Sequence, residues 1–167
     1  MNAQRQQPLA LAGLERAQPT ARWYFAFGSN LDTAQMAHRC PTARAVRTAV
    51  LRGFELAFVG YSATWDGAVA TVQPRARATV RGLLYRMTDE DFERLDRFEG
   101  HPFVYERREI AVSAAHVDRA ETYVLEGELG APARAYLERI ARAYDALGFP
   151  ITPLLRAARR SITTEDE

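Results

Sequence analysis

A glycine followed by two small polar residues ends the first strongly apolar stretch of the chain. Residues Tyr24–Phe27 are aromatic or apolar, and Gly28-Ser29-Asn30 and Leu31 follow them. A buried strand that ends in this way can turn its backbone N–H groups outward, where they can bind an anion or a carboxylate. The same residues are also common in ordinary turns. Ser29 is a weak candidate nucleophile, because its surroundings are not Gly-x-Ser-x-Gly and no histidine–aspartate pair is placed to activate it.

Glu99 is the second candidate for chemistry. It follows Phe92 by seven residues and Leu95 by four, and on a helix these positions share one face. The carboxylate is therefore expected to point with the apolar side chains toward the interior, in the last turn of the helix. Desolvation and the helix dipole would both raise its pKa, as a general base near neutral pH requires. The alternative is a frayed helix end with Glu99 in solvent.

The other reactive side chains give weaker signals. No two of the three histidines fall at metal-ligand spacing, so no metal site is predicted. Cys40 is followed by Pro41 and is expected to be structural rather than nucleophilic. Tyr105, Tyr123 and Tyr136 are each compatible with a core or an interface position, and the residue pattern alone does not decide between these.

Composition restricts the class of protein. The 167 residues suit one domain, and the 47% hydrophobic and 26% charged content is that of a globular protein. The net charge of +1 creates no overall field to attract nucleic acid or an anionic membrane. No apolar run approaches the about 20 residues that span a bilayer. All 22 basic residues are arginine, which excludes lysine Schiff-base chemistry, and one cysteine excludes an intramolecular disulfide. We expect a cytoplasmic protein that binds neither nucleic acid nor membrane.

The pattern along the chain predicts one domain, residues 23–161, between a mobile N-terminal tail, residues 1–22, and an acidic C-terminal tail, residues 162–167. Arg52-Gly53 is expected to be a tight connection between strands, and Pro74 to end one. The predicted strands are short, and they are Trp23–Phe27, Ala45–Leu51, Phe54–Val59, Ala68–Gln73, Thr79–Met87, Val104–Ser113 and Glu121–Leu125.

Four helices are predicted among these strands. Asp32 is the expected N-cap of the first, Gly100 and Gly148 are expected to end the second and third, and Pro132 to open the third. The ranges are Thr33–Arg39, Thr88–Glu99, 132–148 and Pro153–Arg160. A regular alternation of strand and helix is missing, so we predict an α+β fold with a small curled or closed sheet and helices around it.

Two segments, taken in order, resemble the γ-glutamylcyclotransferase superfamily. They are Phe25–Leu31, with the sequence FAFGSNL, and Leu95–Gly100, with the sequence LDRFEG; the similarity extends over roughly residues 23–155. The resemblance implies a small mixed β-barrel with peripheral helices. It also implies a reaction in which the α-amine of a γ-glutamyl group attacks its own γ-carbonyl, giving 5-oxoproline and a free amine or amino acid. No metal or cofactor is implied.

The resemblance also implies roles for individual residues. Glu99 is the implied general acid and base, and Phe27, Gly28, Ser29, Asn30 and Leu31 are implied to hold the γ-glutamyl group through their backbone. The implied cavity tyrosines are Tyr105, Tyr123 and Tyr136. Phe27 departs from the family motif, which usually has tyrosine at this position, so a role for that hydroxyl is lost while backbone contacts are unaffected. Asn30-Leu31 favours the branch that acts on γ-glutamyl amino acids.

Two other functions remain open at this point. One is removal of a γ-glutamyl group from a larger biosynthetic intermediate, for which a wide cavity mouth would be expected. The other is a non-catalytic module that holds a small acid in the same pocket. The leaving amine, the pathway and the oligomeric state do not follow from the sequence.

Overall fold

Five strands close into a barrel in the computed structural model, which describes residues 22–162. In barrel order they are β1 (Arg22–Ala26), β3 (Gly67–Met87), β2 (Arg44–Ser62), β4 (Glu106–Ala114) and β5 (Val117–Val124). β5 pairs with β1 in parallel and every other pairing is antiparallel. This confirms the predicted α+β fold with a small mixed barrel. Of the two predicted tails, residues 1–21 and 163–167 lie outside the described residues.

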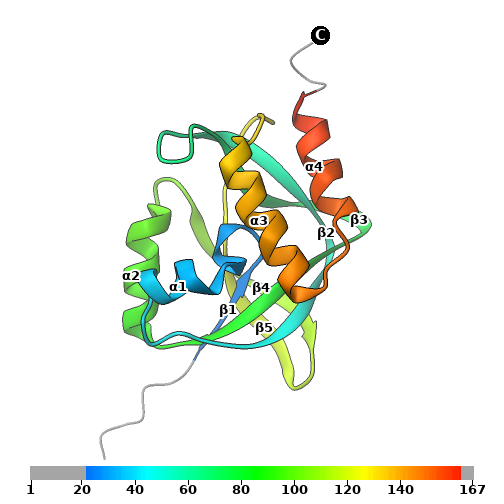
Figure 1. Ribbon diagram of the computed structural model, residues 1–167. Coiled ribbons are helices and arrows are strands. Elements are labelled where there is room, and N and C mark those ends of the chain that lie inside the picture. Colours follow the sequence, from blue (N-terminus) through cyan, green and yellow to red (C-terminus); the bar gives the residue numbers. More distant parts are fainter. Residues whose placement is uncertain (1–21, 163–167) are drawn as a thin grey trace, which may run out of the picture.

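The four α-helices of the described residues lie outside the barrel (Figure 1). α1 (Thr33–Arg39) and α2 (Asp89–Glu99) are on one side, and α3 (Arg134–Leu147) and α4 (Thr152–Ile162) are on another. The largest fully buried side chains include Phe25 and Phe58 from the barrel and Phe92 from α2. β1 and α4 each take one residue of a predicted tail, Arg22 and Ile162. No helix among the described residues is long and apolar enough to cross a membrane.

The ends of α1 and α2 follow from local hydrogen bonding. The Asp32 carboxylate accepts hydrogen bonds from the backbone N–H groups of Ala34 and Gln35, which satisfies donors that a helix start leaves free. Thr88 and Asp91 form a reciprocal capping box at the start of α2. Gly100 ends α2 with φ of 66°, a left-handed conformation that suits glycine. α2 therefore has a fixed end, and Glu99 is its last residue.

Three local predictions are wrong. Gly53 does not turn the chain: β2 runs through it, and its φ of 78° accommodates a register shift between Arg52 and Phe54. Pro74 does not end a strand, because it lies opposite Phe54 at this irregularity, where a missing N–H is tolerated. Pro132 does not open α3, whose N-cap is Ala133. Two long strands, β2 and β3, replace four predicted short ones.

The close approach of β1 to β3 depends on a missing side chain at Gly82. A Cβ atom there would lie 2.4 Å from the Phe25 ring and 2.5 Å from the Ala26 carbonyl oxygen. We expect Gly82→Ala to lower the free energy of unfolding by about 1–3 kcal/mol, because the barrel has to shift to admit the methyl group. Urea denaturation measures this. Gly127→Ala is the control, since its Cβ would meet ordinary contacts at 3.5 Å or more. Equal stability of the two variants would contradict the expectation.

Candidate functional site

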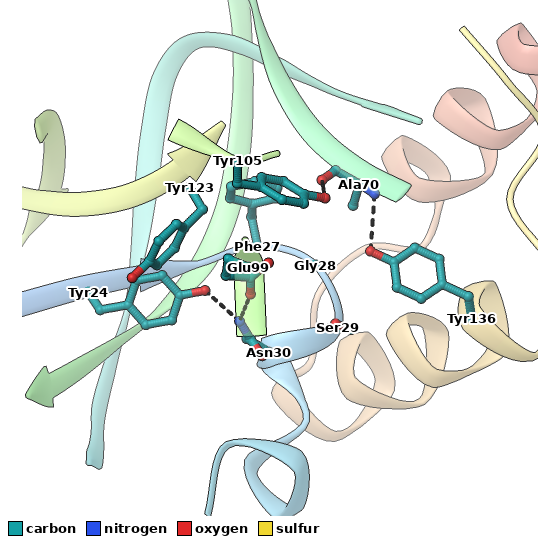
Figure 2. Close-up of a pocket in the computed structure, with 10 residues that line it drawn as sticks. All are labelled: Tyr24, Phe27, Gly28, Ser29, Asn30, Ala70, Glu99, Tyr105, Tyr123 and Tyr136. Carbon is teal, nitrogen blue, oxygen red and sulfur yellow. Dashed lines mark hydrogen bonds between the residues drawn. The ribbon is translucent and has the colours of Figure 1, made fainter. Parts of the chain in front are cut away.

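A pocket opens where β1 ends, and ten residues line it (Figure 2). Eight of the nine residues singled out from the sequence are among them, namely Glu99, Phe27, Gly28, Ser29, Asn30, Tyr105, Tyr123 and Tyr136. Leu31 is the ninth, and it does not line the pocket, because its side chain is buried in the core. The other two lining residues, Tyr24 and Ala70, were not anticipated.

The turn after β1 forms one wall. Residues Ser29–Leu31 make a short 3₁₀ turn, closed by hydrogen bonds from the N–H groups of Leu31 and Asp32 to the carbonyls of Gly28 and Ser29, each 3.0 Å. The backbone N–H groups that precede Leu31 in the turn have no hydrogen-bond partner within it. A Cβ on Gly28 would lie 3.0 Å from the Ala70 Cβ, so glycine allows the turn to approach β3 closely.

Glu99 lines the pocket next to this turn. Its side chain is only 14% exposed. The Oε1 atom accepts hydrogen bonds from Asn30 Nδ2 at 2.8 Å and from Arg39 Nη1 at 3.3 Å. Within the described part of the chain, Oε2 accepts none. The carboxylate is therefore turned inward, not into solvent, and one of its oxygens is fixed while the other is open to a ligand.

Burial sets the protonation behaviour of this carboxylate. Desolvation raises the pKa of Glu99 above the ordinary glutamate value, while the charge of Arg39 and the hydrogen bond from Asn30 act in the opposite direction. The expected contribution of burial is thus present, and the two opposing groups were not foreseen. Arg39 comes from the last turn of α1, and no pattern in the sequence linked it to Glu99.

The Asn30 side chain organises the site, although the sequence predicts a role only for its backbone. Nδ2 donates to the Tyr24 hydroxyl at 2.9 Å as well as to Glu99. Oδ1 accepts from Gln35 Nε2 and Arg39 Nη1, both at 3.0 Å. The Asn30 carbonyl accepts from the Tyr85 hydroxyl at 2.9 Å. With all these groups satisfied in a buried place, the asparagine amide has one orientation, and it directs a donor at Glu99.

Two of the predicted tyrosines cap an open edge of β3. β1 pairs with β3 only over Leu83–Met87, so the edge at Ala70 has no strand beside it among the described residues. The Tyr105 hydroxyl donates to the Ala70 carbonyl at 2.8 Å, and the Ala70 N–H donates to the Tyr136 hydroxyl at 3.0 Å. Both bonds are visible in Figure 2. The sheet edge thereby fixes both rings in the pocket wall.

Tyr123 is held differently. Its hydroxyl donates to Asp96 Oδ1 at 2.6 Å, and its ring packs edge-on against Tyr24, with centroids 5.7 Å apart. Burial raises the pKa of Tyr123 and of the other three pocket tyrosines, so all four hydroxyls stay protonated near neutral pH. Around the Glu99 carboxylate the pocket therefore offers neutral hydroxyl groups. No group of three or more histidine, cysteine, aspartate or glutamate side chains within residues 22–160 is arranged to hold a metal ion.

Comparisons with known proteins show which sequences and structures this chain resembles. A family model described as gamma-glutamyl cyclotransferase, AIG2-like, matches residues 24–142. The gamma-glutamylcyclotransferases of Bos taurus and Homo sapiens are each 36% identical to this chain over 81 residues. These matches cover 46% of this chain and 43% of each relative, so they span less than half of the curated proteins.

Solved structures match over more of the chain. A structure of a gamma-glutamyl cyclotransferase is 26% identical with a TM-score of 0.75, and the alignment covers 82% of this chain and 86% of the other. A structure from Homo sapiens, described as an uncharacterized protein, is 27% identical with a TM-score of 0.74 over the same shares.

Proposed function

This chain belongs to the gamma-glutamyl cyclotransferase, AIG2-like family, and on that premise we propose that it converts a γ-glutamyl amide into 5-oxoproline and a free amine or amino acid. One observation carries the proposal: the Glu99 carboxylate, with one oxygen free, lines the same small pocket as the Gly28–Asn30 turn. That pocket brings a proton acceptor and the backbone of the Gly28–Asn30 turn together in one lining.

The substrate supplies its own nucleophile, the α-amine. The protein therefore has to supply the proton transfers. The α-ammonium of the substrate gives a proton to Glu99, and the amine then attacks the γ-carbonyl carbon. A new carbon–nitrogen bond closes the five-membered ring. Protonated Glu99 returns its proton to the leaving nitrogen, the old carbon–nitrogen bond breaks, and the new ring nitrogen loses its extra proton to the carboxylate. The released amine or water finally takes that proton.

The rest of the pocket positions these atoms. Attack within one molecule is fast only if the chain of the substrate is folded so that its amine meets its carbonyl. The N–H groups of the Gly28–Asn30 turn hold the substrate carboxylate or the oxyanion that forms at the γ-carbon. Asn30 and Arg39 fix Oε1 of Glu99, which leaves Oε2 for the α-amine. Tyr105, Tyr123 and Tyr136 enclose the substrate, and Phe27 contributes through its backbone.

The proposal predicts the pH dependence of the reaction. Glu99 must be ionised to accept the first proton, and burial raises its pKa. Activity is therefore lost as the pH falls through a value above the usual range for glutamate, about 4.3. A profile of kcat/KM against pH measures this. If activity is lost only at or below the ordinary glutamate pKa, the assignment of a desolvated Glu99 as the base is contradicted.

Incubation with γ-glutamyl-alanine tests the function itself. The expected products are 5-oxoproline and alanine in equal amounts, detected by mass spectrometry. Glutamate in place of 5-oxoproline would indicate hydrolysis and would overturn the cyclisation. Stabilisation by 5-oxoproline in a thermal-shift assay, with no turnover of any γ-glutamyl compound, would support the non-catalytic binding module instead.

A second candidate is removal of a γ-glutamyl group from a larger biosynthetic intermediate. The observation that favours it is a wider space beside the pocket, which shares Ser29, Glu99, Tyr105 and Tyr136 with it. The chemistry at Glu99 would be the same and only the leaving amine would differ. Turnover of a large γ-glutamyl amide without turnover of γ-glutamyl dipeptides would favour this candidate.

A further inference from the structure

The wider space is continuous with the pocket at the place where the leaving amine would emerge. Ser29, Glu99, Tyr105 and Tyr136 line both. The γ-glutamyl group has to lie against Glu99 and the Gly28–Asn30 turn for its amine to reach its own carbonyl. Whatever is bonded to that carbonyl through nitrogen therefore extends past the shared residues into the outer space, which we call the vestibule.

The vestibule has two apolar sides. The end of β2 contributes Tyr61, the connection between β2 and β3 contributes Trp65, and Leu125 follows β5. Phe98 in α2 and Val104 after α2 form the other side. Tyr61, Phe98 and Val104 are 69%, 52% and 56% exposed, which is unusual for side chains of this size. In Figure 1 the β2–β3 connection and the chain after α2 lie at the same end of the barrel.

The charges in the vestibule are mainly positive. Its ionisable groups, apart from tyrosine hydroxyls, are Glu99, Arg39 and Arg97. The Arg39 guanidinium already has partners within the protein. It hydrogen-bonds to Glu99 and Asn30 and stacks 5.1 Å from the centre of the Phe98 ring. The Arg97 guanidinium makes no hydrogen bond or ion pair with any described residue. Since Glu99 balances Arg39, the remaining charge is the positive charge of Arg97.

We propose that the vestibule selects a leaving group that is an amino acid with a large apolar or aromatic side chain and a free α-carboxylate. The side chain lies between Trp65 and Phe98, and the carboxylate pairs with Arg97. A cationic leaving amine would be repelled by Arg97, and a small one would leave the apolar sides in water. This assignment rests on the proposed function and adds to it the chemical class of the released amine.

The test compares four substrates of the wild-type protein: γ-glutamyl-phenylalanine, its carboxamide, γ-glutamyl-alanine and ε-(γ-glutamyl)-lysine, each followed by 5-oxoproline release. We expect kcat/KM for the phenylalanine substrate to exceed that for alanine by about tenfold, the difference that one apolar side chain makes in a pocket. The carboxamide should be slower than the acid by about fivefold, since an exposed ion pair contributes little more. The lysine substrate should be the slowest.

Variants assign these differences to residues. Trp65→Ala should remove most of the preference for phenylalanine over alanine, and Arg97→Gln should make the acid and the carboxamide equal. Phe103→Ala and Arg94→Gln are the matched controls: Phe103 is 95% exposed, Arg94 pairs with Glu90, and neither side chain lines the vestibule. The measured quantity is a ratio between substrates, so a general loss of activity in Trp65→Ala does not obscure the result.

Failures of the two proposals look different. If no γ-glutamyl compound yields 5-oxoproline, the proposed function is wrong and this inference is wrong with it. If 5-oxoproline forms from all four substrates equally well, or fastest from the alanine or lysine compound, the cyclisation stands and the assignment of the vestibule is overturned. A preference for phenylalanine that survives in Trp65→Ala would also overturn it.

Discussion

Replacing Glu99 with glutamine is expected to lower kcat by about 10²- to 10⁴-fold, the usual contribution of a positioned acid–base group. Glutamine keeps the size of the side chain and can still accept the hydrogen bonds from Asn30 and Arg39, so the pocket should keep its shape. What it lacks is a group that takes a proton from the α-ammonium. The measurement is 5-oxoproline release at saturating γ-glutamyl-alanine.

Unfolding is not expected to explain this loss. The pKa of Glu99 is raised in the folded protein, so its ionisation costs folding free energy as the pH rises through that pKa. Glu99→Gln has no such cost and should be at least as stable as the wild type at pH 7. Glu93→Gln is the control, because this exposed residue of the same helix faces away from the core. A Glu99→Gln variant with more than half the wild-type kcat would rule out the assigned role.

Replacing Asn30 with aspartate is expected to move the acidic limb of the pH profile to higher pH and to lower kcat/KM at pH 7 by about 10- to 100-fold. The substitution changes size very little. It turns a donor 2.8 Å from Glu99 Oε1 into a second carboxylate. Arg39, 3.0 Å from the Asn30 Oδ1 position, favours ionisation of the new group, so Glu99 is the member of the pair that stays protonated longer. The loss of the hydrogen bond from the Asn30 amide to the charged Glu99 carboxylate is expected to lower kcat/KM by a similar factor.

The profile of kcat/KM against pH separates this effect from simple damage. A damaged site loses activity at every pH, whereas a raised Glu99 pKa allows part of the activity to return as the pH rises. Gln73→Glu is the matched control, since it adds the same charge on β3 at a half-buried position that does not line the pocket. A profile for Asn30→Asp that coincides with that of the wild type would mean that the Asn30 amide does not set the protonation of Glu99.

The parts of the site that could be predicted are those governed by local rules. α1 has the bounds Thr33–Arg39 expected from the sequence, and Gly100 ends α2 as expected, because capping depends on residues a few positions apart. The inward direction of Glu99 follows from its spacing to Phe92 and Leu95, which are both fully buried. The α+β barrel was predicted by the density of short apolar runs and by the resemblance of two motifs.

The parts that could not be predicted depend on partners far apart in the chain. Tyr24 reads as one more apolar residue of β1, and only the fold brings its hydroxyl to Asn30. Ala70 has no reactive side chain, and it belongs to the pocket because its strand edge lacks a neighbour there. Gly53 and Pro74 are turn residues by local preference, and their mutual register in the long β2–β3 pair overrides that preference.

A structure of the protein with 5-oxoproline bound tests the central claim most directly. The expected result is a product ring in the pocket between Glu99 and the Gly28–Asn30 turn. Its ring nitrogen should lie about 3 Å from Glu99 Oε2, and one of its oxygens should accept hydrogen bonds from the backbone of the turn. A product bound elsewhere on the barrel, or bound in the pocket with its ring nitrogen turned away from Glu99, would contradict the account.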